Sequence, residues 1–270
     1  MGEVKVIFNG EVIHTSAKDS LEFFTSHTQG GDEVWILNGF ATKEPIALQE
    51  NDELFCIKKG VLPKEEVLES MMRARHTPKL HHKLKSAKVA ICGLGGLGSH
   101  IAIMLARVGV GTLRLIDFDS IEPSNLNRQS YMVEDLGKPK TKALAEQITR
   151  INPFITTEPL HLKIEQDNIK QALDGVDIVC EAFDNAHTKA MLAQSFHTFF
   201  PDTPLICASG LAGFGDSNTI RTKKITPYLY VCGDLENGAQ VGRGLMAPRV
   251  VLCAAHQANL VVELLSSKGI

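Results

Sequence analysis

The chain has 270 residues, which is enough for one large domain or two smaller ones. It is 44% hydrophobic and 22% charged, as ordinary globular proteins are, and its net charge of −3 gives no reason to expect nucleic-acid binding. The N-terminus carries no basic-then-apolar leader, and we find no apolar run of about 18 residues. We therefore expect a cytoplasmic protein without a membrane span.

The cysteines favour a reducing compartment. None of the six belongs to a Cys-x-x-Cys pair, so we expect no structural zinc site. Four of them lie in apolar runs typical of a reduced protein core, namely Cys56, Cys92, Cys180 and Cys207.

The first 60 residues have the pattern of a small α+β domain. Alternating runs flank Asn9-Gly10, the strongest short hairpin signal, and Asp19 is placed to cap a short helix. Further strands are predicted at residues 34–37 and 54–58. This order of hairpin, helix and two strands indicates a ubiquitin-like (β-grasp) roll over residues 1–60. Residues 61–87 are expected to form a helical connector, with a helix from about residue 63 to 72.

Residues 88–270 alternate strands with helices, which predicts an α/β, Rossmann-like, doubly wound sheet. Strands are expected at 89–92, 113–116, about 154–162, 176–183 and 204–208. Helices are expected at about 97–108, from 138–142 onward, and at about 166–173, 186–199 and 248–265. Glycines are frequent between residues 209 and 248, so that segment is predicted to be partly loop and partly irregular strand.

A glycine-rich turn joins the first of these strands to its helix, and two acids end the second strand. Gly93 permits a tight turn off the strand, Gly95 lets the backbone approach a phosphate, and Gly98 lets the helix lie close to the sheet. The helix N-terminus then faces the anion. The alternative is a tight turn without a ligand. The nucleotide-binding residues predicted here are Gly93, Gly95, Gly96, Gly98, Asp117 and Asp119.

Further polar residues follow the carboxyl ends of the predicted strands, which is the ligand side of an open α/β sheet. Two are cations, and a site that cleaves a triphosphate needs cations to stabilise the charge that develops on phosphorus and the leaving group. An aspartate after the strand at 176–183 is a candidate Mg²⁺ ligand. Three structural alternatives stay open: an arginine that braces its own loop, a solvated lysine, and an aspartate that caps a helix. The residues in question are Asn125, Arg128, Gln129, Lys140 and Asp184.

Five motifs in order resemble the ubiquitin-activating superfamily, and most of all its ThiF and MoeB adenylyltransferases. They are GLGGLGS, LIDFD, SNLNRQ, GKPK and the DN that follows a buried strand. The N-terminal domain resembles ThiS-type sulfur carriers, but it continues through Lys59-Gly60-Val61 instead of ending in a free Gly-Gly. The combination is similar to a second ThiF family, in which both domains share one chain.

The resemblance implies that a sulfur carrier's C-terminal glycine carboxylate attacks the α-phosphate of ATP, releasing pyrophosphate, in thiamine biosynthesis. It implies that Asp117 binds ribose and Asp184 holds Mg²⁺. It also implies a homodimer in which an arginine, here Arg75, reaches the partner's site. Cys232 is either a thiol that joins the carrier covalently or a packed structural thiol. The resemblance further implies that the phosphates are bound by Asn125, Arg128 and Lys140.

Other functions remain open at this point. The same superfamily includes enzymes that adenylate the molybdopterin-synthase carrier or a carboxylate on tRNA. A different class is an NAD-dependent oxidoreductase, although hydride transfer has no use for the cations Arg128 and Lys140. A non-enzymatic alternative is a scaffold that binds nucleotide and presents its N-terminal domain to a partner.

Overall fold

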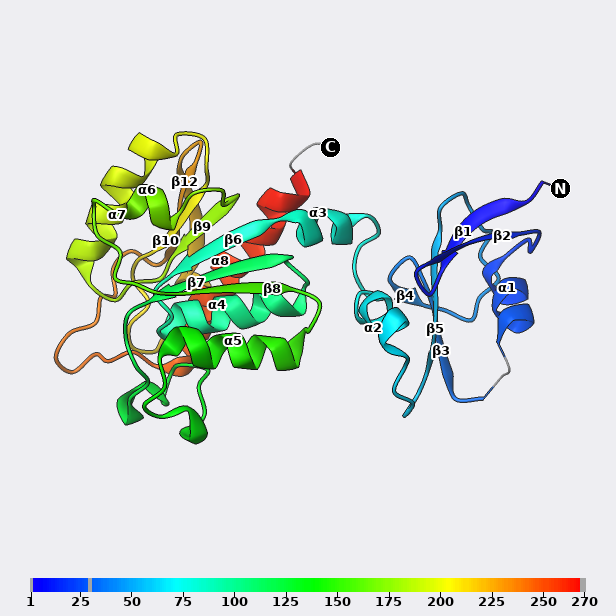
Figure 1. The fold of residues 1–270 in the computed structure, drawn as a ribbon, viewed down its shortest axis with the longest axis horizontal. Helices are drawn as coiled ribbons and strands as arrows, with labels where there is room; N and C mark the ends of the chain where they lie inside the picture. Colours follow the sequence, from blue (N-terminus) through cyan, green and yellow to red (C-terminus); the bar gives the residue numbers. More distant parts are fainter. Residues whose placement is uncertain (1, 29–30, 268–270) are drawn as a thin grey trace. The chain divides into compact units, whose positions relative to one another are not determined.

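The computed structural model describes residues 2–28 and 31–267. Contacts between residues divide the chain into two compact units, residues 1–82 and residues 83–270. Figure 1 shows a small unit rich in strands and a larger unit in which helices surround a sheet.

The first unit has the β-grasp fold that its sequence predicts. Its described part holds a five-stranded sheet in the order β2-β1-β5-β3-β4, with β1 and β5 parallel and the other neighbours antiparallel. The predicted Asn9-Gly10 turn and a second Asn-Gly turn, Asn38-Gly39, have positive φ at both positions, which suits a two-residue hairpin. The strands are β1 (Val4–Phe8), β2 (Glu11–Thr15), β3 (Glu33–Leu37), β4 (Phe40–Ala41) and β5 (Glu53–Lys58).

Helix α1 (Ser20–His27) packs its aromatic side chains on this sheet. The carboxylate of Asp19 caps it by accepting the Glu22 N–H at 2.9 Å, as the sequence predicts. Phe23 and Phe24 are fully buried with Val6 and strand residues of β3 and β5. This cluster forms the core of the first unit.

The segment after β5 also belongs to the first unit. Helix α2 (Glu65–Met72) is attached through the Ser70 hydroxyl, which donates to the Asn9 carbonyl at 2.8 Å. Ala74 is buried with Ile36 and Phe55, on a second cluster of the same sheet. The chain downstream of the grasp strands therefore completes their hydrophobic core up to about residue 76. Helix α3 (Leu80–Ser86) follows.

The second unit contains a Rossmann-like, doubly wound sheet, as predicted. Its described part has seven strands in the order β11-β12-β10-β9-β6-β7-β8, all parallel except the edge strand β11. The chain builds β6, β7 and β8 outward to one side and then returns to place β9 on the other side of β6. The strands are β6 (Lys88–Cys92), β7 (Thr112–Asp117), β8 (Thr156–His161), β9 (Ile178–Glu181), β10 (Leu205–Ala208), β11 (Arg221–Thr226) and β12 (Leu229–Gly233).

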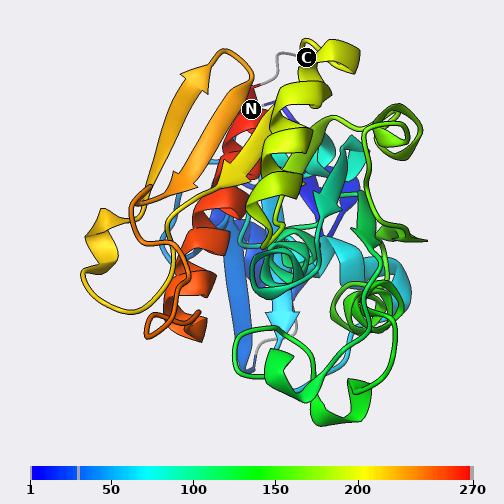
Figure 2. The ribbon, with the colours of Figure 1, turned by 90° about the vertical axis from the view of Figure 1, so that its left-hand side faces the viewer.

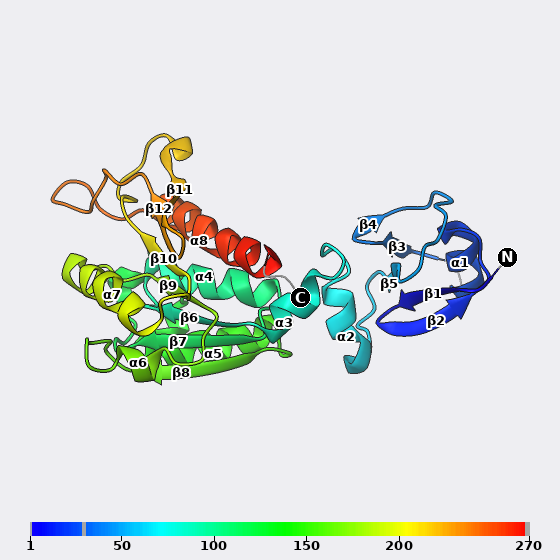
Figure 3. The ribbon, with the colours of Figure 1, turned by 90° about the horizontal axis from the view of Figure 1, so that it is seen from above.

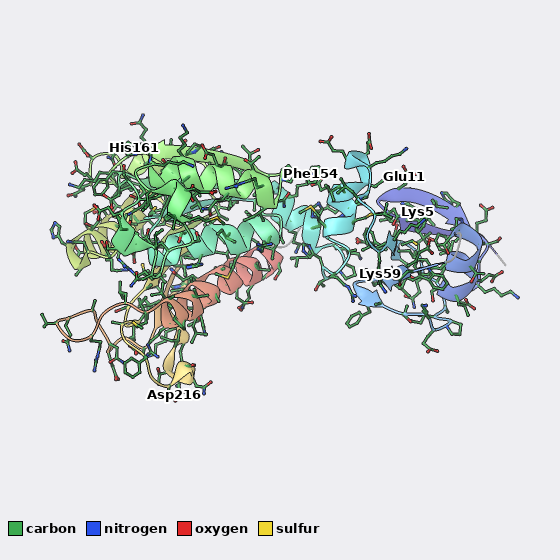
Figure 4. All side chains as sticks on the ribbon, turned by 90° about the horizontal axis from the view of Figure 1, so that it is seen from below. Lys5, Glu11, Lys59, Phe154, His161 and Asp216 are labelled. Atoms are coloured by element: carbon green, nitrogen blue, oxygen red, sulfur yellow. The ribbon has the colours of Figure 1, made fainter. Side chains whose placement is uncertain are left out.

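Helices cover both faces of this sheet (Figures 2 and 3). On one face, α4 (Gly96–Arg107) contacts α5 (Lys140–Ile151) and α8 (Ala247–Ser267). On the other, α6 (Ile169–Ala172) and α7 (Ala186–Phe199) bury Leu192 and Phe196 against strand side chains such as Val179. Figure 4 shows how the side chains of the larger unit fill the space between these layers and labels His161 at the end of β8.

Helix α8 corrects one expectation. Its described residues include an 18-residue window with a mean hydropathy of 1.4, which by length and composition is enough to cross a membrane. The expectation that no segment reaches this limit is therefore wrong. The helix packs on α4 and on β10, β11 and β12, and 44% of the window is buried. This packing accounts for the apolar sequence, because a core helix passes the same test as a membrane span.

Candidate active site

The sheet order creates a crevice where the chain changes direction, at the carboxyl ends of β7, β6 and β9. The Gly93 N–H donates to the Ile116 carbonyl of β7 at 2.8 Å, and Gly93 has φ of +91°. A Cβ on Gly93 would lie 2.9 Å from the carbonyl oxygen of Ala182, which follows β9. The glycine turn, the acids of β7 and the turn after β9 therefore meet at the topological switch point, where open α/β sheets bind ligands.

The glycine turn leaves its backbone open toward this crevice. Gly95 is the N-cap of α4 and offers no side chain to the first N–H groups of the helix. A Cβ at Gly95 would meet only the Gln129 amide nitrogen, at 3.7 Å. At Gly96 the same atom would approach Val250 and the stem of Arg128. The loop that follows β7 therefore lies directly beside the helix N-terminus.

The carboxylate of Asp117 fixes the glycine turn to the end of β7. Its Oδ2 accepts the Leu94 N–H at 2.6 Å, and its Oδ1 accepts the Asp119 N–H at 2.8 Å. The residue is only 8% exposed. Asp117 thus shapes the turn as well as standing at the predicted ribose position.

Lys140 extends toward these two acids from the first turn of α5. Its ammonium lies 2.9 Å from Asp119 Oδ2 and 4.0 Å from Asp117 Oδ2. Only 8% of the Lys140 side chain is exposed, so it is not a solvated lysine. The Asp119 carboxylate is about half exposed, which leaves one side of this ion pair open to a ligand.

The loop after β7 holds the remaining predicted phosphate-binding residues. The side-chain Oδ1 of Asn125 accepts the Glu122 N–H at 3.1 Å and closes a short 3₁₀ turn. The Arg128 guanidinium donates to the carbonyl of Ser124 at 3.0 Å and to the Asn127 side chain at 2.9 Å. It is braced by its own loop, and neither of these partners is an acid.

Gln129 is buried beside the glycine turn. Within the described part of the chain, its side-chain oxygen has no hydrogen-bond partner, although the residue is only 8% exposed. A buried amide oxygen without a partner is costly unless a ligand or water supplies one. Gln129 is thus a polar group that a nucleotide in this crevice would satisfy.

Asp184 lies in the turn between β9 and α7 and is exposed. The cap of α7 is the neighbouring Asn185, whose side chain accepts the N–H groups of His187 at 2.8 Å and Thr188 at 3.2 Å. No described residue forms a hydrogen bond or ion pair with the Asp184 carboxylate. Nor does any group of three His, Cys, Asp or Glu side chains among the described residues form a metal cage.

Sequence reasoning missed an ion pair directly behind this turn, between a buried glutamate and a partly exposed lysine. The Glu181 side chain is fully buried, and its carboxylate accepts the Lys189 ammonium at 2.8 and 3.1 Å. Glu181 Oε1 also accepts the Phe183 N–H at 2.7 Å. Burial raises the pKa of Glu181, and the ion pair with Lys189 opposes that rise. The signal was a charged residue inside the apolar run VCEAF, which a buried strand tolerates only with a partner.

Tyr131 was also missed. Its hydroxyl donates to the Leu94 carbonyl inside the glycine turn at 2.8 Å, and the ring is buried. Burial raises the pKa of this phenol. The group is a neutral donor to the Leu94 carbonyl, while Asp117 accepts the N–H of the same residue.

Cys232 lies in β12 and is fully buried. Its thiol is 3.5 Å from the Thr222 hydroxyl, and burial raises its pKa to about 11. Such a thiol stays protonated at neutral pH and has little nucleophilic character. Although Cys232 lies in the glycine-rich segment, its burial favours the packed structural thiol.

The loops after β10 and β12 are tied together by a buried carboxylate, Asp234. Its side chain is 4% exposed and pairs with Arg249 of α8. Arg249 also donates to the Asp216 carbonyl at 3.1 Å, so α8 holds both loops. Burial alone would raise the pKa of Asp234, but hydrogen bonds from Asn237, Glu236 and Arg249 outweigh it and lower the pKa to about 2.

Arg75 belongs to the first unit, where its side chain is exposed between α2 and α3. The neighbouring Arg73 lies 3.8 Å from Glu53 of β5. Arg75 therefore has the exposure that contact with another subunit requires, and its role there stays a prediction.

Comparison with known proteins agrees with this architecture. Residues 69–269 match the ThiF family, and residues 4–60 match the ThiS-like ubiquitin family. The molybdopterin-synthase adenylyltransferase of Salmonella typhimurium is 32% identical over 190 residues, which are 69% of this chain and 76% of that protein. The sulfur carrier protein ThiS adenylyltransferase of Escherichia coli is 33% identical over 190 residues, 68% of this chain and 74% of that protein.

A solved structure supports the fold independently. The crystal structure of the E. coli tRNA N6-threonylcarbamoyladenosine dehydratase in complex with ATP has a TM-score of 0.67 at 21% identity, covering 77% of this chain and 98% of that one. The family matches confirm the resemblance drawn from the five motifs. The chain belongs to the ThiF family, as an adenylyltransferase that carries a ThiS-like ubiquitin domain at its N-terminus.

Proposed function

We propose that the enzyme uses ATP to adenylate the C-terminal glycine carboxylate of a ThiS-type sulfur carrier protein, with release of pyrophosphate. The observation that carries this proposal is the position of Lys140. Its ammonium is buried between Asp117 and Asp119 at the edge of the sheet, beside the open N-terminus of α4. A buried cation next to a helix N-terminus suits a polyphosphate and has no use in hydride transfer.

The chemistry follows from the charges that develop during the reaction. The carrier carboxylate attacks the α-phosphorus, and the bond to the bridging oxygen of pyrophosphate breaks. Negative charge grows on the phosphoryl oxygens and on the leaving group, where fixed cations and N–H groups stabilise it. Lys140 and Arg128 supply the cations, and the N–H groups of the glycine turn supply the dipoles. Asn125 and Gln129 add neutral polar contacts beside that turn.

The residues present also fit Mg²⁺. This ion is usually held by one or two carboxylates together with substrate phosphates, and the exposed Asp184 carboxylate has no competing partner among the described residues. Asp184 would therefore hold it, and the ion would neutralise phosphate charge when bound. Asp117, with both oxygens already accepting N–H groups, would orient the ribose hydroxyls.

The choice of carrier is the finer part of the proposal. The ThiS-like N-terminal unit supports a carrier protein over tRNA, and the net charge of −3 gives no general attraction to RNA. We assign the carrier to thiamine biosynthesis, with the molybdopterin-synthase carrier as the alternative that the first relative's name supports.

Assembly and location complete the proposal. We expect a cytoplasmic homodimer, in which Arg75 contributes to the partner's site and the N-terminal unit orients the carrier or supports dimer formation. Buried cysteines without disulfides suit a reducing compartment. The N-terminal unit is not itself the acyl substrate, because its last strand continues into α2 and leaves no terminal carboxylate.

Carrier-dependent exchange of labelled pyrophosphate into ATP in the presence of Mg²⁺ tests the proposal. Each candidate carrier is supplied in turn, and a carrier that lacks its last glycine is the control. Exchange with the ThiS-type carrier alone supports the full proposal. Exchange only with the molybdopterin-synthase carrier would make that carrier the substrate. AMP transfer only to a tRNA would make the tRNA the substrate. No exchange with any carrier, together with thermal stabilisation by NADH and not ATP, would overturn the reaction itself.

A further inference from the structure

Asp184 is the proposed metal ligand, yet nothing in the described chain holds its carboxylate in place. The turn that carries it runs from Ala182 to Asn185, between a buried strand and α7. The orientation of the Asp184 carboxylate must therefore come from the backbone of this turn. Glu181 is the residue whose contacts reach that backbone.

Glu181 connects the ends of two strands and one helix at this point. Its Oε1 accepts the Phe183 N–H at 2.7 Å, one residue before Asp184. Its other carboxylate oxygen accepts the ammonium of Lys189 from α7 and lies 3.5 Å from the Ala208 N–H at the end of β10. Lys189 in turn donates to the Ala208 carbonyl at 3.1 Å.

A second helix secures the same strand end from the opposite face of the sheet. The fully buried Gln257 of α8 donates from Nε2 to the Glu181 carbonyl at 3.1 Å and to the Ile206 carbonyl of β10 at 3.0 Å. The backbone of Glu181 is thus fixed on one face and its side chain on the other. Together these contacts restrict the backbone conformation of the turn that begins at Ala182.

Stability alone does not explain why an ion pair is used to hold this turn. Replacing a buried ion pair with apolar residues of similar size is often neutral or stabilising. A hydrogen-bonded charge behind a metal ligand, by contrast, orients that ligand, and its loss typically lowers metal affinity. Glu181 does not contact the Asp184 carboxylate; it acts one step further back, through the Phe183 N–H of the turn that carries Asp184.

We infer that the ion pair between the buried Glu181 carboxylate and Lys189 is the positioning device of the proposed metal site: it holds the Ala182–Asn185 turn so that the Asp184 carboxylate faces the crevice. Neither residue touches the reacting atoms. The inference rests on the proposed role of Asp184 and not on the identity of the carrier.

Calorimetric titration of ATP, with Mg²⁺ and with a chelator, tests the inference in the full-length enzyme. For Glu181→Ala, the gain in ATP affinity that Mg²⁺ provides should fall about tenfold or more, while affinity without Mg²⁺ stays unchanged. Hydrogen exchange of the Phe183 amide in the free enzyme should accelerate in the same variant. Lys189→Arg, which keeps the charge, should retain most of the Mg²⁺ effect.

Glu158→Ala is the matched control. Glu158 of β8 also binds two cations, Lys88 and Arg114, at 2.7 Å, but it lies away from the Asp184 turn. It should lower thermal stability and leave the Mg²⁺-dependent gain intact. A Glu181→Ala enzyme that keeps the wild-type gain, or loses affinity equally with and without Mg²⁺, would overturn the inference.

Two further outcomes are informative. If Glu181→Ala does not fold, Glu181→Gln carries the same test, because it preserves the shape but loses the charge that binds Lys189. An unchanged Mg²⁺ effect in that variant would likewise count against the inference. A wild-type enzyme that binds ATP with Mg²⁺ but activates no carrier would contradict the proposed reaction and leave the positioning role standing.

Discussion

A Cβ atom at Gly98 would lie 1.8 Å from the carbonyl oxygen of Gly93, closer than any real contact. The first turn of α4 thus rests directly on the end of β6, and the two glycines define one close approach of backbone to backbone. A Cβ at Gly95, between them in sequence, would meet only the Gln129 amide nitrogen, at an ordinary contact distance of 3.7 Å. The same motif therefore contains one glycine required for packing and one whose side is free for a ligand.

Gly98→Ala should destabilise the fold, whereas Gly95→Ala should not. The added methyl at residue 98 forces the helix off the strand, and over-packing of this kind costs about 1–3 kcal/mol. Gly95→Ala should keep its melting temperature and lose ATP affinity, because the methyl projects toward the proposed phosphate site. Thermal unfolding and ATP titration of both variants check this. Equal ATP affinity in Gly95→Ala and wild type would refute the claim that a phosphate of ATP lies against Gly95.

Lys140→Ala should reduce carrier-dependent pyrophosphate exchange by about 100- to 1,000-fold, the usual cost of removing one group that stabilises developing charge. Lys142→Ala is the matched control, because it removes an exposed lysine from the same helix. That variant should exchange at nearly the wild-type rate. Similar losses in both variants would mean that the helix, and not the buried ammonium, matters.

Asp184→Ala should abolish Mg²⁺-dependent exchange while the melting temperature stays unchanged, since the side chain is exposed and the described chain gives it no partner. Asp202→Ala removes another exposed carboxylate, beyond α7, and should have no effect. Asn185→Ala should instead lower stability by about 1 kcal/mol, because it removes the cap of α7. Near-normal exchange in Asp184→Ala would exclude its metal role.

Asp234 should contribute to stability at neutral pH and lose that contribution in acid. Its pKa falls from an ordinary 3.8 to about 2 in the folded state, so the stabilisation is complete above about pH 4 and disappears as pH falls toward 2. The difference amounts to about 2 kcal/mol. Asp234→Asn should therefore be less stable than wild type at pH 7, with the two unfolding curves converging in acid. A difference in unfolding free energy between the two proteins that does not change with pH would contradict a stabilising role for the ionised Asp234 carboxylate.

Cys232 should resist alkylation in the folded enzyme, because it is fully buried and its pKa is raised to about 11. Cys56 is half-buried, and burial with the nearby Glu33 raises its pKa to about 11, so it should react slowly but first. Mass spectrometry after iodoacetamide treatment distinguishes them. Cys232→Ser should retain pyrophosphate exchange, and a covalent carrier adduct on Cys232 would overturn this expectation.

The sequence by itself determined the elements and their chemistry where the signal is local. Asn9-Gly10 specified a hairpin, Asp19 a helix cap, and the four glycines a turn into α4, because each depends on backbone geometry within a few residues. Motif order was enough to indicate the family. These features do not require knowledge of which distant residues come together.

Only the tertiary structure decided what each polar or apolar side chain meets. It placed the Lys140 ammonium between two acids at the end of β7, made Asn185 and not Asp184 the cap of α7, and buried Cys232 in a strand within the glycine-rich segment. It also showed that the apolar run of α8 is a core helix and that Glu181 has its partner on α7. Burial and pairing depend on strand order and layer packing, so a local pattern could indicate that Glu181 needs a partner but could not identify that partner.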